Sequence, residues 1–313
     1  MDLTNLKVYS EKDFPPYLPK LSSIYDDLFS GGKGLRSRLI RLTTKYLPLS
    51  EKQVLLLAQT IEFIHNASLL HDDLIDRSHL RRNKTTAWLK YTPEYAVLAG
   101  DYLLARVMVN LSKNGNIRLV QYTSEVISDL LEGEWIQDSL IKDHNVELEA
   151  LDRVHNLKTA SLFKWSLRAP FYCNENYDIN LHHHLEEMGT ILGQIFQRSD
   201  DLLDFNIRNE EKKAVLGDLK SGYLNSFAAF LMKDFSEPKR VEFMKCQSMP
   251  EVYSLLGEKY FFSAVEDFDN INTALIELFD HHLHRLEGFL SESQLGLIKE
   301  LRTVSQKLYW RRT

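Results

Sequence analysis

The chain has 313 residues, of which 44% are hydrophobic, so it can bury a large core. Its formal net charge of −6 argues against a protein whose main role is to bind nucleic acid, because that role favours an excess of Lys and Arg. The only cysteines, Cys173 and Cys246, lack the spacing of a disulfide framework or a zinc site. No signal sequence or uncharged apolar run of about 20 residues occurs, so we expect a cytoplasmic protein with at most peripheral membrane contact.

The long segments are rich in helix-forming residues and lack strand-like alternation, which predicts helices. The segment 50–66 places apolar residues at steps of three or four behind the N-terminal cap Ser50, and it continues into His71-Asp72-Asp73. We expect further helices near 21–30, 36–47, 92–112, 117–141, 148–173, 181–206, 222–234, 237–246, 250–280 and 291–308. We expect loops at 31–34, 76–84, 113–116, 173–178 and 208–221. The prediction is all-α: a single-domain bundle over residues 1–313, with about ten or more helices around a central cavity.

The pattern DDxxD occurs twice, at 72–76 and 200–204, each time inside an apolar helical segment. Residues four apart share a helix face, so Asp72 with Asp76, and Asp200 with Asp204, present paired carboxylates. Such like-charged pairs weaken a helix by about 0.2–0.5 kcal/mol, and burying them unpaired costs more. A lone DDxxD is more often a solvated acidic face, but two copies in apolar surroundings favour Mg²⁺ ions that bind a diphosphate.

Cationic segments suited to phosphate accompany these motifs. Arg81-Arg82-Asn83-Lys84 follows the first motif, and a glycine-rich run with Lys33, Arg36 and Arg38 lies near the N-terminus. Arg presents a planar fork to phosphate oxygens, and glycines let backbone N–H groups approach an anion closely. Each cluster alone is weak evidence, but together with the acidic motifs they predict a second diphosphate site.

At this point the chain resembles the trans-polyprenyl diphosphate synthase family, from about residue 31 to 222. The resemblance implies the isoprenoid synthase fold, Mg²⁺ as cofactor, and condensation of isopentenyl diphosphate with an allylic diphosphate. The matching segments are GGKGLRSRL (31–39), EFIHNASLLHDDLIDRSHLRRNKTTAW (62–88), VLAGDYLLAR (97–106), KTASLF (158–163), GQIFQRSDDLLDF (193–205) and KAVLGDLKSGY (213–223).

The resemblance also implies a role for each matching residue. Isopentenyl diphosphate would be bound by four of them: Lys33, Arg36, His65 and Arg82. The allylic diphosphate would be bound by Arg81 and by Mg²⁺ held on Asp72, Asp76, Asp200 and Asp204, with Asp73 and Asp201 supporting the metal. Beside the carbon that becomes cationic would lie Lys158, Thr159 and Gln197. Lys213 would complete the phosphate site, although the segment after the second motif departs from the family pattern and leaves Lys212 as its competitor.

Product length is expected to depend on the helix before the first motif. Ala67 and Ser68 are small where relatives that stop at C15 or C20 often carry an aromatic residue, so we expect a product longer than C20, like that of hexaprenyl and heptaprenyl synthases. The alternative is that the helix at 101–111 blocks the tunnel, with Tyr102, Leu104 and Met108, as in a short-chain farnesyl or geranylgeranyl diphosphate synthase.

Other interpretations remain open at this stage. A terpene cyclase shares the helical fold and one DDxxD, but its second metal motif normally differs from the one found here. A catalytic or regulatory subunit of a two-component synthase is a further alternative. The family implies a homodimer, with a heterodimer containing a small subunit as the alternative, and no nucleic-acid partner.

Overall fold

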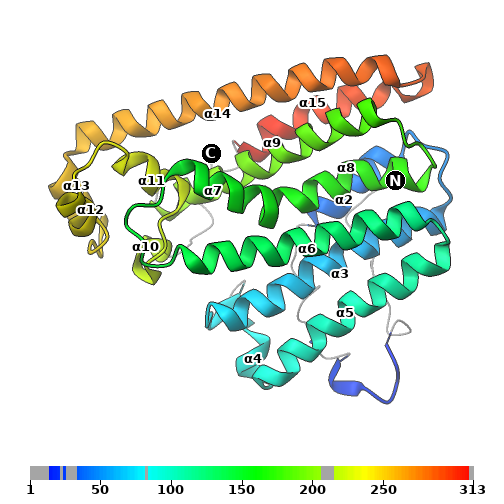
Figure 1. The fold of residues 1–313 in the computed structure, drawn as a ribbon, viewed down its shortest axis with the longest axis horizontal. Coiled ribbons are helices and arrows are strands. Elements are labelled where there is room, and N and C mark those ends of the chain that lie inside the picture. The colour runs from blue at the N-terminus through cyan, green and yellow to red at the C-terminus, as the bar shows by residue number, and fades with distance from the viewer. Residues whose placement is uncertain (1–13, 22–23, 26–33, 82–83, 206–214, 310–313) are drawn as a thin grey trace. The chain divides into compact units, whose positions relative to one another are not determined.

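The computed structural model describes residues 14–21, 24–25, 34–81, 84–205 and 215–309 (Figure 1). Its internal contacts group the chain into two compact units. The first comprises Met1–Ile127 and Trp165–Tyr177, and the second comprises Ser128–Lys164 and Asp178–Thr313. The predicted single domain over 1–313 stays a prediction.

The first unit is built on α3, which runs over Glu51–Ile75 and packs against α2 and α5. Ser50 caps α3 with the reciprocal bonds of a capping box shared with Gln53, which confirms the predicted Ser cap. The other elements of this unit are α2 (Leu35–Thr44), α4 (Ala87–Lys90), α5 (Pro93–Asn114) and an antiparallel pair of two-residue strands, β1 (Leu80–Arg81) and β2 (Lys84–Thr85).

Two helices, α6 (Ile117–Ser139) and α8 (Ser161–Cys173), contribute residues to both units. The second unit is centred on α9 (Ile179–Asp204), along which α14 and α15 pack (Figure 1). Asp178 caps α9 by accepting bonds from the backbone N–H groups of Asn180 and Leu181. The other helices of the second unit are α7 (Leu148–Val154), α10 (Gly217–Ser221), α11 (Ser226–Met232), α12 (Glu237–Phe243), α13 (Met249–Leu256), α14 (Glu258–Leu286) and α15 (Gly296–Tyr309).

Four details differ from the sequence prediction. The expected helix 148–173 contains a π-helical turn, η3 (His155–Ala160), between α7 and α8. The expected loop 208–221 contains α10 at its end, and the expected helix 250–280 is broken at Gly257, whose φ of 82° ends α13 before α14 begins. The expected loop 76–84 contains most of the β1–β2 pair.

The all-α prediction is confirmed, since β1 and β2 are the only strands among the described residues. Within the same part of the chain, no helix combines the length and apolar character needed to span a bilayer.

Candidate active site

The first aspartate motif lies at the C-terminal end of α3. Asp72 is half-buried, Asp73 is buried, and Asp76 is exposed where it caps the helix end. Behind the motif, His71 packs on Gly100 of α5 so closely that a Cβ at position 100 would lie 2.3 Å from His71 Nε2. The glycine therefore allows the end of α3 to approach α5.

Asp73 and Arg81, two predicted site residues, form an ion pair. Arg81 Nε and Nη2 each lie 2.7 Å from Asp73 Oδ1. The loop between them is fixed by the carbonyl of Ser78, which accepts bonds from Thr86 Oγ1 at 2.7 Å and from Trp88 Nε1 at 2.9 Å. The buried carboxylate of Asp73 thus holds the guanidinium beside the first motif.

Arg36 of α2 and His65 of α3 also lie together, as their shared predicted role requires. Arg36 Nη1 is 3.2 Å from His65 Nε2. Further along α3, Ala67 is fully buried, and Ser68 Oγ donates to the carbonyl of His65 at 2.9 Å. The other predicted residues for isopentenyl diphosphate, Lys33 and Arg82, lie outside the described residues, as do Lys212 and Lys213.

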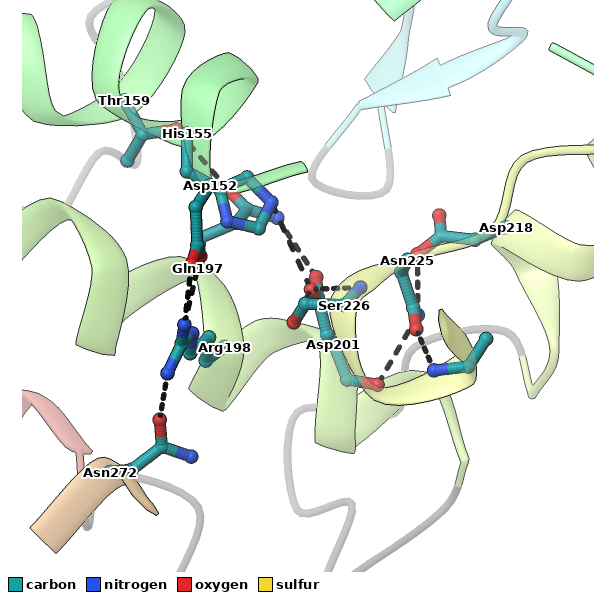
Figure 2. A network of polar contacts seen from close by, with 11 residues as sticks. Asp152, His155, Thr159, Gln197, Arg198, Asp201, Asp218, Asn225, Ser226 and Asn272 are labelled. Carbon is teal, nitrogen blue, oxygen red and sulfur yellow. Dashed lines mark hydrogen bonds and ion pairs between the residues drawn. The ribbon is translucent and has the colours of Figure 1, made fainter. Parts of the chain in front are cut away.

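The second motif forms the last turn of α9 (Figure 2). Asp200 is half-buried, whereas Asp201 is only 2% exposed. Asp201 Oδ2 accepts bonds from both the backbone N–H and the hydroxyl of Ser226, and Oδ1 accepts one from Gln197 Nε2 at 3.0 Å. The buried His155 has its Nε2 4.0 Å from Asp201 Oδ2, and burial lowers the pKa of His155 to about 4. Asp201 is therefore bound by the neutral donors of Ser226 and Gln197.

The carboxylate of Asp204 is buried, and only one of its two oxygens accepts hydrogen bonds from the described residues. Its Oδ1 accepts a bond from the backbone N–H of Gly217 at 2.6 Å, while no described residue donates a hydrogen bond to Oδ2. Burial, followed by the charge of Asp218, raises the pKa of Asp204 to about 7. No cation of the described residues forms an ion pair with Asp204, so a divalent cation bound there would supply compensating charge.

The π-helical turn packs against α9 and brings Thr159 close to Gln197 (Figure 2). Thr159 Oγ1 donates to Gln197 Oε1 at 3.3 Å, so two predicted catalytic residues are in contact. Lys158 forms an ion pair with Glu134 of α6, and its Nζ lies 3.4 Å from Gln137 Oε1. Sequence reasoning did not find Glu134 or Gln137, although they are three residues apart and face the same direction on a helix.

A second network holds α9 in place beneath the motif (Figure 2). The buried Arg198 binds both oxygens of Asp152, at 2.8 and 2.9 Å, and donates to Asn272 at 3.2 Å. Asn272 in turn donates to the hydroxyl of Tyr309 at 3.0 Å. These bonds join α9 to α7, α14 and α15. The aspartate motif in the sequence did not predict them.

Three or more His, Cys, Asp or Glu side chains do not gather as a metal-binding group anywhere among the described residues. Proteins bind Mg²⁺ with one or two carboxylates, and phosphate oxygens and water fill the remaining positions. The half-satisfied Asp204 fits such a cation.

A family model described as polyprenyl synthetase matches residues 18–251 of the chain. The chain belongs to the polyprenyl synthetase family. A prenyl transferase of Synechocystis sp. is 36% identical over 69% of the chain and 68% of its own length. Solanesyl-diphosphate synthase 2, chloroplastic, of Oryza sativa subsp. japonica is 37% identical over 71% of the chain, and the match spans little more than half, 56%, of that relative.

The fold also agrees with that of solved members of this family. A decaprenyl diphosphate synthase from Rhodobacter capsulatus superposes with a TM-score of 0.85 over 97% of this chain and 93% of that chain, at 24% sequence identity. The predicted family and the predicted all-α isoprenoid synthase fold are confirmed by these matches.

Proposed function

We propose that the chain is a trans-prenyltransferase that condenses isopentenyl diphosphate with an allylic diphosphate to give a linear polyprenyl diphosphate longer than C20. The observation that carries the proposal is the match of the polyprenyl synthetase model across both aspartate motifs. The names of the relatives support the long product, because solanesyl and decaprenyl diphosphate synthases are among them.

The cofactor in this proposal is a divalent cation, Mg²⁺, held by Asp72, Asp76, Asp200 and Asp204. When bound, the cation neutralises the charge that develops on the leaving diphosphate. Asp204 supports the assignment, because its Oδ2 is buried and receives no hydrogen bond from the described residues. Asp73 and Asp201 keep the supporting role predicted for them, through their bonds to Arg81 and Ser226.

In this proposal, different cationic residues bind the two substrates. Arg36 and His65, which are 3.2 Å apart, bind isopentenyl diphosphate, together with Lys33 and Arg82. Arg81, held by Asp73, binds the allylic diphosphate, and Lys213 completes that phosphate site. The allylic C–O bond breaks toward a carbocation, and the double bond of isopentenyl diphosphate attacks it.

In this proposal, residues of the π-helical turn lie beside the carbon that becomes cationic. Thr159 and Gln197 share a hydrogen bond, and in this proposal the dipoles of their oxygens stabilise positive charge at that carbon. Lys158, held by Glu134, lies beside the same carbon in this proposal. The proton lost after condensation passes to the departing diphosphate in this proposal, because no protein base stands out in the sequence motifs.

Ala67 and Ser68 allow the product to grow along α3 in this proposal. Ala67 is fully buried, so a larger side chain at this position would have to displace its neighbours or occupy space next to α3, which makes Ala67→Phe a test of this part of the proposal. A homodimer, or a heterodimer with a small subunit, a single domain over 1–313, a cytoplasmic location and peripheral membrane contact stay predictions.

The test is incubation of the purified chain with radiolabelled isopentenyl diphosphate, MgCl₂ and C5, C10 or C15 primers in turn, followed by separation of the products by length. We expect products longer than C20 that disappear with EDTA and return with MgCl₂. Asp72→Ala and Asp200→Ala should each lower kcat by at least about 100-fold at unchanged helix content. The matched control is Asp267→Ala, at an exposed position of α14, which should retain full activity. Near-normal turnover in either motif variant would contradict the proposal.

A further inference from the structure

The second unit carries an unusual concentration of histidine far from the aspartate motif. Of the eleven histidines in the chain, three stand at 182–184 near the start of α9, and three stand at 281, 282 and 284 near the end of α14. Because α9 and α14 pack along each other, the two groups meet. None of the six belongs to the site described above.

His184 and His282 form the centre of this group. Their Nδ1 atoms are 3.1 Å apart, and both side chains are half-buried. The ring of Phe289 lies against His184, with centroids 5.8 Å apart, and the exposed His183 flanks the pair at 5.4 Å from His184 and 6.2 Å from His282. The pair is thus packed on one side and reachable from solvent on the other.

The separation of the two nitrogens suits a shared metal ion. For a metal–nitrogen bond of about 2.05 Å, nitrogens 3.1 Å apart subtend about 98° at the ion, between the octahedral and tetrahedral angles. In the metal-free pair one Nδ1–H donates to the other Nδ1. If the donating ring moves its proton to Nε2, both Nδ1 lone pairs become available without net release of a proton.

The environment of the two histidines favours the neutral imidazole form that binds metal ions. Burial, and then the positive charges of neighbouring groups, lower the pKa of His184 and leave its imidazole neutral, the form that binds metals; burial likewise lowers the pKa of His282. Glu187, one turn further along α9, supplies a negative charge that both rings sense, while Arg285 opposes it at His184. Imidazole ligands favour Zn²⁺, Cu²⁺ and Ni²⁺ over Mg²⁺.

We propose that His184 and His282 form a two-imidazole site for a divalent transition metal ion, with water completing its coordination. The site is separate from the catalytic one, because the sixteen residues from His184 to Asp200 span about 24 Å of α9. A bound ion joins the beginning of α9 to the end of α14 and stabilises the folded chain.

The test uses the untagged full chain, freed of metal with a chelator and titrated with CuCl₂ in excess MgCl₂. We expect one Cu²⁺ per chain, an electron paramagnetic resonance signal with superhyperfine coupling to two nitrogens, displacement by ZnCl₂, and a melting midpoint that rises with either ion. His184→Gln and His282→Gln should each weaken binding at least about tenfold and remove the two-nitrogen signal. Prenyl transfer should be unchanged in both variants.

The matched control is His284→Gln, on the same helix, where the exposed imidazole pairs with Glu287 at 3.5 Å. It should change the affinity by less than about twofold. A wild-type signal without two-nitrogen coupling overturns the proposal and does not depend on the folding of any variant. Equal weakening in all three variants also overturns it, because it indicates unspecific binding to surface histidines.

Discussion

Gly193 determines how closely α9 can approach the π-helical turn. A Cβ at position 193 would lie 2.3 Å from Ala160 Cβ, 2.4 Å from its Cα and 2.7 Å from its backbone nitrogen. Two of these three atoms belong to the backbone, so no side-chain rotation can relieve the overlap. We therefore expect Gly193→Ala to force α9 and η3 apart.

The cost follows from the packing. Carbon atoms pack at about 3.5–4.0 Å, so the two segments must separate by about 1.2 Å or more. Overpacking costs about 1–3 kcal/mol, and we expect about 3 because backbone must move. The higher helix propensity of Ala offsets about 1 kcal/mol of this cost, which leaves a net loss of unfolding free energy of about 2 kcal/mol. The Thr159–Gln197 bond, already 3.3 Å long, would be broken by the same movement, so kcat should fall as well.

Urea unfolding followed by circular dichroism measures the loss of stability, and labelled isopentenyl diphosphate measures kcat and KM. Gly288→Ala is the matched control, since a Cβ there meets no atom within 4 Å and its φ is not left-handed. It should gain about 0.4–1 kcal/mol and keep its kcat. Wild-type stability and turnover in Gly193→Ala would refute the reasoning.

Three further changes test other parts of the site. Glu134→Gln removes the charge that holds Lys158, so kcat should fall about tenfold, the equivalent of about 1.4 kcal/mol, while the unfolding midpoint stays unchanged; an unaltered kcat would show that Lys158 needs no such partner. Asp152→Ala leaves the guanidinium of Arg198 buried with Asn272 as its remaining partner in this network, so urea unfolding should show a loss of about 3 kcal/mol, and a loss below about 1 kcal/mol would contradict this role. Ala67→Phe should shorten the product on reverse-phase separation, provided that circular dichroism shows an intact fold, and an unchanged product length would count against a tunnel along α3.

Local patterns predicted the helices and the contacts that depend on them. Ser50 caps α3 because its side chain and that of Gln53 are three residues apart, a relation that is visible in the sequence. The contact of Arg36 with His65, and that of Thr159 with Gln197, could be anticipated only through the family resemblance, which assigned each pair to one substrate or one reacting carbon.

Features that depend on close packing between segments could not be predicted in this way. The π-helical turn η3 keeps the composition of an ordinary helix, and Glu134 is one acidic residue among many until the fold places it beside Lys158. Gly193 did carry a signal, because glycine destabilises a helix interior by about 1 kcal/mol and persists there when another segment lies close. The sequence contained the two histidine groups, but nothing in it indicated that they meet.

The two aspartate motifs share one arrangement that bears on their function. In each, the middle aspartate is buried and bound by donors of the protein, Asp73 by Arg81 and Asp201 by Ser226 and Gln197. Asp204, at the end of the second motif, has a different environment. Its Oδ2 receives no hydrogen bond from the described residues, and its pKa is raised to about 7. A carboxylate that only stabilised the fold would gain from partners that lower its pKa, so the raised pKa of Asp204, with no bond to Oδ2 from the described residues, is compatible with the cation proposed for this motif.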